Sequence, residues 1–339
     1  MEEHTAVTDA PLSRSTDTEA KAAARPPLLI PPGRIPLLDQ LRGVALVAMT
    51  LYHFVWDLGF FNYLLPDTAA TGGWVILARC IAFSFLFLVG IGLFIAHRDG
   101  VKRKPFLLRL AQVGGAAAVI SLVTYFAVPG GFIFFGILHA IALFSVLGLL
   151  FLRLPWWLTP GFALVVGGVG LSVNHEFFAT PWLWWAGLSP TPPPSNDYVP
   201  LFPWFAATLL GIAAAQLMPR EGWFRAAETS FIKPLGPVLG FMGRHSLVYY
   251  LIHQPILIGL IWAFVQINGP PDYTPTFSHL CNKDCLKIQD EGFCQTYCGC
   301  MKNTLNTMSL MDDVRDGKLN FAQSQAGQDM VKACSREAF

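Results

Sequence analysis

Long apolar runs separated by short polar or Gly/Pro-rich breaks dominate the chain between residues 36 and 267. A helix of about 20 apolar residues is long enough to cross the hydrocarbon core of a bilayer. Seven runs reach or approach this length and predict membrane-spanning helices at 36–56, 74–96, 106–128, 131–152, 156–173, 201–218 and 246–267. The predicted fold class is therefore all-α, a polytopic bundle of about seven transmembrane helices with a small helical tail after it.

Polar segments flank this apolar region at both ends. Residues 1–34 are rich in Ala, Thr and Pro, carry mixed charge and lack the apolar core of a signal peptide. We interpret them as a disordered cytoplasmic tail. The transmembrane domain then extends over 35–268, and a polar C-terminal tail covers 272–339 after Gly269-Pro270-Pro271.

The composition supports the membrane interpretation. Hydrophobic residues make up 53% of the 339 residues and charged residues only 13%, whereas a soluble domain carries about 25% charged residues. Membrane lipids are therefore the expected surroundings of the bundle. The net charge of +1 and the absence of a basic stripe argue against nucleic acid as a partner.

Basic residues are distributed unevenly between the predicted loops. The loops at 57–73, 129–130 and 174–200 contain no Lys or Arg. The other loops and their flanks hold Arg98, Lys102, Arg103, Lys104, Arg109, Arg153, Arg220, Arg225 and Lys233. Because basic loops remain in the cytoplasm, we predict a cytoplasmic N-terminus and a C-terminus on the opposite side of the membrane.

The C-terminal tail contains most of the cysteines: Cys281, Cys285, Cys294, Cys298, Cys300 and Cys334. Two pairs are spaced by four residues, which places both thiols of a pair on one face of a helix. Two antiparallel helices would join Cys281 to Cys298 and Cys285 to Cys294, which leaves Cys300 and Cys334 for a third bridge. An oxidising compartment favours this disulfide interpretation, and a zinc site is the alternative.

Ionisable and amide side chains within or beside the apolar runs are candidates for function, because such groups are unfavourable in hydrocarbon and usually face the bundle interior. Near the cytoplasmic side these are Asp39, Arg42, Arg244 and His245. Near the middle of the bilayer they are His139, His253 and Gln254, and near the outer side His53, Asp57, Arg79, His175 and Asp197. Together they predict a polar path across the bundle.

Structural roles are alternatives for several of these residues. Asp39 and Arg42 are three residues apart and form a local ion pair if both lie on one helix. His53 and Asp57 are four residues apart, so the carboxylate either orients the imidazole and raises its basicity or helps to anchor the helix at the membrane surface. For the mid-depth histidines His139 and His253, the alternative is a hydrogen bond to a neighbouring helix.

The first apolar run carries a recognisable motif. Leu-Asp-Gln-Leu-Arg-Gly-Val-Ala at 38–45, with Tyr-His-Phe at 52–54, resembles the first span of membrane-bound acyltransferases that move acetyl groups onto sugars. The acyltransferase-3 group and the heparan-α-glucosaminide N-acetyltransferase catalytic-domain family both begin in a similar way. The stretches at 83–93, 135–142, 197–205 and 243–255 resemble a bacterial branch of the second family.

This resemblance implies acetyl-CoA as a cytosolic donor, an amino sugar or glycan acceptor on the far side, and a location in a bacterial inner membrane with the C-terminus in the periplasm. The acyltransferase-3 group has a histidine 14 residues after the aspartate, which corresponds to His53. The heparan enzymes instead use a histidine three residues before a tryptophan. Here the tryptophan corresponds to Trp74 and the matching position is Thr71, so His53 is the stronger catalytic candidate.

The resulting hypothesis assigns a role to each group. His53, oriented by Asp57, is the general base, and His139 and His253 stabilise the thioester oxyanion or relay protons. The residues expected to bind the donor are Asp39, Arg42, Arg244 and His245, and those expected to contact the acceptor are Arg79, His175 and Asp197. No metal is expected. The alternative functions are a transporter or lipid-binding membrane protein, and a non-catalytic membrane scaffold that presents the cysteine-rich tail.

Overall fold

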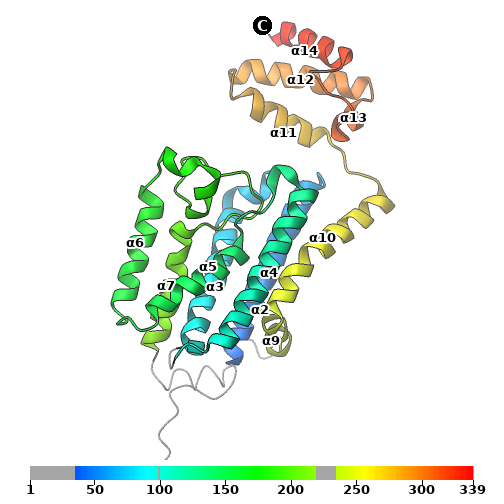
Figure 1. The fold of residues 1–339 in the computed structure, drawn as a ribbon. Coiled ribbons are helices and arrows are strands. Elements are labelled where there is room, and N and C mark those ends of the chain that lie inside the picture. Colours follow the sequence, from blue (N-terminus) through cyan, green and yellow to red (C-terminus); the bar gives the residue numbers. More distant parts are fainter. Residues whose placement is uncertain (1–34, 98–99, 219–233, 339) are drawn as a thin grey trace, which may run out of the picture.

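The computed structural model describes residues 35–97, 100–218 and 234–338, and within these ranges the chain is helical without a β-strand (Figure 1). The bundle contains α2 (Pro36–Phe60), α3 (Gly72–His97), α4 (Arg103–Ala127), α5 (Ile137–Gly148), α6 (Leu158–Ser172), α7 (Leu201–Leu217), α9 (Gly236–Arg244) and α10 (Ser246–Asn268). The C-terminal region contains α11 (Thr274–Cys285), α12 (Glu291–Thr307), α13 (Met311–Arg315) and α14 (Gln325–Ala338).

Four of the described helices are long and apolar enough to cross a membrane, namely α2, α3, α4 and α10. The predicted number of seven spans is therefore not confirmed. Helices α6 and α7 have 15 and 17 residues, about 23 and 26 Å of helix, against about 30 Å of hydrocarbon. The run at 131–152 begins in an irregular segment, in which Phe135 bridges to Tyr198, before α5 starts.

The first helix extends further than its apolar run. The hydrophobic pattern predicted a span ending at residue 56, whereas α2 continues to Phe60. Asp57 therefore belongs to the helix and not to the following loop. His53 and Asp57 lie one helical turn apart on the same helix, which is the geometry that their spacing requires for a shared face.

Glycines allow two pairs of helices in the bundle to approach closely. A β-carbon on Gly43 of α2 or on Gly243 of α9 would overlap the backbone of the facing helix. The same holds for Gly90 of α3 and Gly211 of α7. Such contacts between small residues are a main source of helix association in lipid, where apolar burial alone gives no preference for a protein neighbour. Two of the motif segments, 38–45 and 243–255, thus meet backbone to backbone.

The C-terminal helices form a separate small cluster, which we call the cysteine-rich domain (residues 272–338). Three disulfides join Cys281 to Cys298, Cys285 to Cys294 and Cys300 to Cys334. The pairing predicted from the cysteine spacing is therefore confirmed. An apolar core around Phe277, Leu305 and Met330 lies beside these bridges.

An ion-pair contact links the cysteine-rich domain to the bundle. Asp67, in the turn between α2 and α3, lies 2.8 Å from Nε2 of His279 and 3.0 Å from Nζ of Lys283, both on α11. Lys283 and His279 lower the pKa of the Asp67 carboxyl group to about 2. This contact holds α11 beside the end of the bundle where α2 ends and α3 begins (Figure 1).

Candidate active site

Two histidines from distant parts of the chain meet between α2 and α10. The ring centroids of His53 and His253 are 5.0 Å apart, in an edge-to-face arrangement. A hydrogen bond of 2.8 Å between the hydroxyl groups of Thr50 and Tyr249 joins the same two helices. Tyr249 and His253 are one turn apart on α10. The Thr50–Tyr249 bond therefore fixes the rotation of α10 relative to α2, so that the face of α10 that carries His253 is turned toward His53.

A buried carboxylate lies one turn along α2 from His53. Asp57 has no exposed surface, and its Oδ1 atom accepts a hydrogen bond of 2.5 Å from Nε2 of Gln254 on α10. The second oxygen, Oδ2, has no hydrogen-bond partner. A buried polar atom without a partner is unfavourable and is a common mark of a functional site. Gln254 thus fixes the position of Asp57 and leaves one carboxylate oxygen available.

His253 has a defined arrangement of its ring nitrogens. Its Nδ1 atom lies 2.7 Å from the carbonyl oxygen of Tyr250. A carbonyl oxygen only accepts, so Nδ1 carries the proton in the neutral ring and Nε2 presents a lone pair. The side chain is 7% exposed and its Nε2 has no partner. One ring nitrogen of His253 is therefore free to accept a proton next to His53.

Asp197 connects the loop before α7 with two helices. Its Oδ2 atom accepts from the backbone N–H of Ile137 at 2.8 Å and from the hydroxyl group of Tyr250 at 3.1 Å. A β-carbon on Gly136 would overlap this carboxyl group. Asp197 therefore occupies the N-terminus of α5, where a carboxylate is favoured by the helix dipole, and positions α10 through Tyr250.

His139 is engaged at both ring nitrogens. Nδ1 accepts from the backbone N–H of Gly136 at 3.2 Å, so Nε2 carries the proton and faces Oγ of Ser121 at 3.1 Å. Ser121 in turn donates to the carbonyl oxygen of Ile133 at 2.6 Å. Sequence reasoning placed His139 and His253 together at mid-depth, but the hydrogen bonds of the described residues hold them in two separate networks.

A second polar site lies at the opposite end of the bundle. A cavity of about 150 Å³ is bordered by Arg42, His97 and Arg109, together with small and apolar residues of α3, α4 and α5. Nη1 of Arg42 is held 3.1 Å from Oδ1 of Asp39, so the predicted local pair is confirmed. Nδ1 of His97 is buried without a hydrogen-bond partner. Two guanidinium groups and an imidazole at one cavity form a site suited to an anion.

Sequence reasoning missed part of this cavity. Arg109 entered only as a basic residue near a predicted loop, and His97 did not enter at all. His97 is the last residue of α3, and Arg109 lies in the first turns of α4. Their places beside the loop that joins these two helices are the signal in the sequence that would have found them. Arg244 and His245, which were expected there, are exposed at the end of α9 and do not border the cavity.

Two further candidates lie on the surface of the bundle. Arg79 is exposed on α3, and His175 is exposed before the short helix at Glu176–Ala179, where its Nδ1 accepts from the backbone N–H of Phe177 at 3.1 Å. Among the described residues, neither side chain forms a hydrogen bond or ring contact with His53, Asp57 or His253. Within residues 35–97, 100–218 and 234–338, no group of three or more His, Cys, Asp or Glu side chains is arranged to hold a metal ion.

Long apolar helices with partnered and orphaned polar groups between them define an integral membrane protein. The model of the family described as heparan-alpha-glucosaminide N-acetyltransferase, catalytic, matches residues 34–255, and the chain belongs to this family. No curated protein and no solved structure matches the chain. The matched region includes His53, Asp57, His253 and Gln254, and ends before the cysteine-rich domain.

Proposed function

We propose that this protein is a membrane acetyltransferase that moves an acetyl group from cytosolic acetyl-CoA to an amino sugar or glycan hydroxyl on the other side of a bacterial inner membrane. The observation that carries the proposal is the group formed by His53, His253 and the buried Asp57 within the region that matches the family. The family description names an N-acetyltransferase, and a histidine pair beside a fixed carboxylate is suited to removing a proton from an acceptor.

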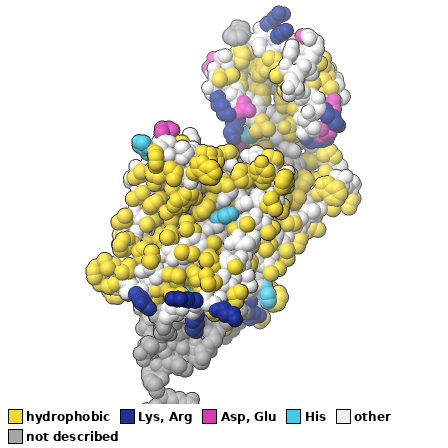
Figure 2. All heavy atoms as spheres, in the orientation of Figure 1, with side chains coloured by type: hydrophobic (Ala, Val, Ile, Leu, Met, Phe, Trp, Pro, Cys, Tyr) yellow, Lys and Arg dark blue, Asp and Glu magenta, His cyan; other side chains and the backbone are white. Residues whose placement is uncertain are grey.

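The orientation rests on the two ends of the molecule. On the face shown in Figure 2, Lys and Arg side chains of the bundle gather at the end remote from the cysteine-rich domain. Basic residues favour the cytoplasmic side, and disulfides persist in oxidising compartments such as the periplasm. Both features support a cytoplasmic N-terminus and a periplasmic C-terminus. The basic residues Arg98, Arg220, Arg225 and Lys233 lie outside the described residues.

The cavity at Arg42 is the proposed donor site. Acetyl-CoA carries phosphates at one end, and the guanidinium groups of Arg42 and Arg109 are suited to bind them. The orphaned Nδ1 of His97 supplies a further polar contact in an otherwise apolar wall. A cavity of about 150 Å³ holds only part of such a molecule, so the nucleotide end extends to the surface, where Arg244 and His245 are exposed at the same end. Asp39 orients Arg42.

The acetyl transfer is proposed to take place at His53. The acceptor hydroxyl or amine loses its proton to the imidazole, its lone pair bonds to the thioester carbonyl carbon, and the carbon–sulfur bond breaks as the thiolate leaves. His253 accepts a proton at Nε2 and is suited to relay it. Asp57 is hydrogen-bonded to Gln254 and its second oxygen has no partner, so its proposed contribution is the negative charge, one helical turn from His53, that stabilises the protonated ring. Both ring nitrogens of His139 are hydrogen-bonded, so its proposed role is to position α5.

The acceptor is proposed to approach from the side of the cysteine-rich domain, where Arg79, His175 and Asp197 were expected to contact it. The carboxylate of Asp197 is already bonded to Ile137 and Tyr250. Its contribution is therefore to position α5 and α10, whereas Arg79 and His175 are exposed and accessible to a glycan.

Reconstitution into vesicles tests the proposal. With isotopically labelled acetyl-CoA on the side of the basic loops and methyl α-glucosaminide on the other side, we expect labelled N-acetyl sugar on the acceptor side. Movement of unmodified sugar without thioester consumption would instead indicate a transporter. Vesicles that neither consume the thioester nor move the sugar would favour the scaffold function and contradict the proposal.

A further inference from the structure

A cleft of about 440 Å³ lies between the bundle and the cysteine-rich domain. The bundle side is formed by the end of α2, with Phe60, Phe61 and Asn62, and by the end of α10 with the linker that follows it. The other side is formed by Arg315 and Asp316 at the end of α13. The cleft thus exists only because the cysteine-rich domain lies against this end of the bundle.

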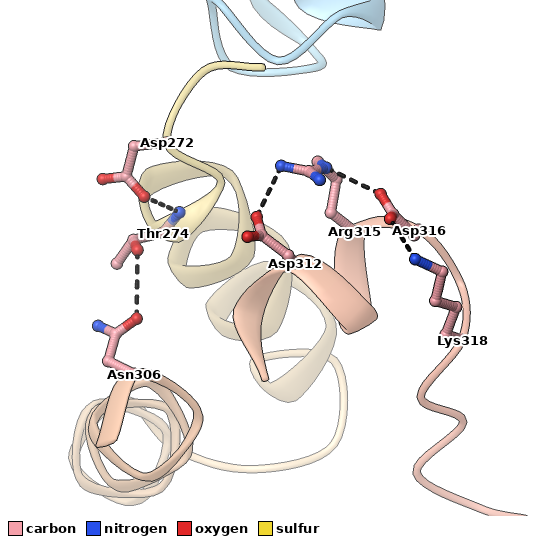
Figure 3. A network of polar contacts seen from close by, with 7 residues as sticks. All are labelled: Asp272, Thr274, Asn306, Asp312, Arg315, Asp316 and Lys318. Atoms are coloured by element: carbon pink, nitrogen blue, oxygen red, sulfur yellow. Dashed lines mark hydrogen bonds and ion pairs between the residues drawn. The ribbon is translucent and has the colours of Figure 1, made fainter. Parts of the chain in front are cut away.

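The wall supplied by the cysteine-rich domain is held in place by an ion-pair network (Figure 3). Arg315 lies 2.7 Å from Asp312 and 3.0 Å from Asp316, and Lys318 lies 2.9 Å from Asp316. Lys318 and Arg315 lower the pKa of the Asp316 carboxyl group, which is therefore ionised at neutral pH. The Arg315 side chain is only 17% exposed. These contacts fix a charged, hydrogen-bonding edge above the cleft.

The opposite wall combines aromatic faces with amide groups. Phe60 is 56% exposed, stacks on Trp56 at 5.6 Å and meets the edge of Phe61 at 5.3 Å. Asn62 has a positive φ of 64°, a conformation for which Asn and Gly are suited. Gln266 adds a second amide from the α10 side. Apolar aromatic walls with a few fixed polar groups are typical of small-molecule sites, and a volume of several hundred cubic ångströms fits this class.

The position of the cleft indicates what it binds. Phe61, the residue directly after α2, follows Asp57 by four residues, about 6 Å along the helix axis. We propose that the cleft binds a sugar ring of the acceptor, with its C–H face on Phe60 or Phe61 and its hydroxyl groups bonded to the amides and to the Arg315–Asp316 edge. This proposal rests on the proposed function for the identity of the substrate. It gives the cysteine-rich domain, which lies outside the family region, the role of one wall of an acceptor subsite.

Binding without turnover tests the proposal. The full chain in lipid nanodiscs is mixed with methyl α-glucosaminide in the absence of acetyl-CoA, and saturation-transfer NMR measures the affinity for the sugar. For Phe60→Ala and Phe61→Ala, loss of one aromatic contact is expected to weaken binding about threefold to tenfold. Asn62→Gly keeps the positive-φ backbone, removes the amide and is expected to weaken binding in the same direction.

Ile288→Ala is the matched control, because this residue is 81% exposed in the cysteine-rich domain and does not border the cleft. Its affinity for the sugar is expected to equal that of the wild type. Equal affinities for all variants would overturn the cleft proposal while leaving acetyl transfer intact. A wild-type protein that binds no sugar would also overturn it. Sugar binding that requires Phe60 or Phe61 in a protein without transferase activity would support the cleft and contradict the proposed function alone.

Discussion

The bundle and the cysteine-rich domain are built from the same kind of element but stabilised by different interactions. In the bundle, glycines such as Gly43 and Gly243 bring backbones into contact, and polar groups such as Asp57 and Gln254 pair inside. In the cysteine-rich domain, three disulfides and a small apolar core hold four helices together. The difference follows from the surroundings, because burying apolar side chains is favourable in water but gives no advantage over contact with lipid.

The two regions also differ in whether their buried polar groups have partners, and this difference separates the proposed acetyl transfer from the proposed binding of the acceptor. Buried polar atoms of Asp57, His97 and His253 in the bundle have no partner, whereas Nε2 of His279 in the cysteine-rich domain lies 2.8 Å from the Asp67 carboxylate. In the cysteine-rich domain, charged side chains such as Asp312, Arg315, Asp316 and Lys318 pair with one another. Unsatisfied groups mark places that bind or react, whereas satisfied networks hold shape. The bundle is therefore the expected site of acetyl transfer, and the cysteine-rich domain is the expected support for the acceptor.

The largest effect is expected from His53→Ala, which removes the proposed base from the bundle. Loss of a general base lowers the rate about 100-fold or more, so acetyl transfer in vesicles should fall by this factor while the thermal unfolding of the protein is unchanged. Leu164→Ala is the control, since this residue is 78% exposed on α6 and borders neither the cavity at Arg42 nor the cleft at Phe60. Equal activity of the His53 variant and the wild type would contradict the assignment of acetyl transfer to this site in the bundle.

The disulfides give the next effect, which is confined to the cysteine-rich domain. Loss of the bridge between Cys300 and Cys334, which are 34 residues apart, should destabilise this domain by about 4 kcal/mol. Loss of the bridge between Cys285 and Cys294, which are nine residues apart, should destabilise it by about 3 kcal/mol. Hydrogen exchange of peptides from α12 and α2 in the paired Cys→Ser variants measures both regions.

Faster exchange is expected in α12 and not in α2. Cys80→Ser is the matched control, because this cysteine is free and exposed on α3, and it should change neither peptide. If α2 also lost protection in the disulfide variants, the two regions would be one cooperative unit and the comparison above would be wrong.

The bundle has its own weak point at the contact of α2 with α9. Gly43→Ala or Gly243→Ala places a methyl group against facing backbone and should destabilise the bundle by about 1–3 kcal/mol. Thermal unfolding in detergent measures this change. Gly259→Ala on α10 meets open space and should leave the midpoint unchanged or slightly raised. Equal midpoints for all three variants would mean that the close approach of α2 and α9 does not stabilise the bundle.

The smallest effect concerns the contact between the two regions. Because Lys283 and His279 lower the pKa of Asp67 from 3.8 to about 2, this contact favours docking fully above pH about 4 and loses its contribution as the pH falls toward about 2. Spin-label distances between α3 and α12 should therefore broaden at low pH. Asp67→Asn should broaden them already at pH 7 and reduce the further change on acidification.

Asp284→Asn is the control for this experiment. Its carboxyl group also has a lowered pKa, but its partner is Lys287 within the same domain, so the distances at pH 7 should match those of the wild type. Distances that do not depend on Asp67 would show that other contacts hold the cysteine-rich domain in place.

Local patterns predicted a large part of the molecule. The runs at 36–56 and 246–267 became α2 and α10 with ends shifted by four residues or fewer, because a helix in lipid must be apolar over its whole length. The cysteine spacing predicted two of the bridges, since residues four apart share a helix face, and the third joins the two cysteines that remained. The count of seven spans is not confirmed, because apolar residues such as Phe135 lie in irregular chain and not in a long helix.

The sequence by itself determined the membrane class, the long helices, the disulfide pairing and the candidate His53 and Asp57, because each of these follows from composition or from spacing within one segment. Only the tertiary structure decided that His253 lies beside His53, that Gln254 fixes Asp57 and that Arg109 and His97 join Arg42 at one cavity. These contacts join residues far apart along the chain. They depend on how helices rotate and cross when glycines and hydrogen bonds bring them together, which no single segment specifies.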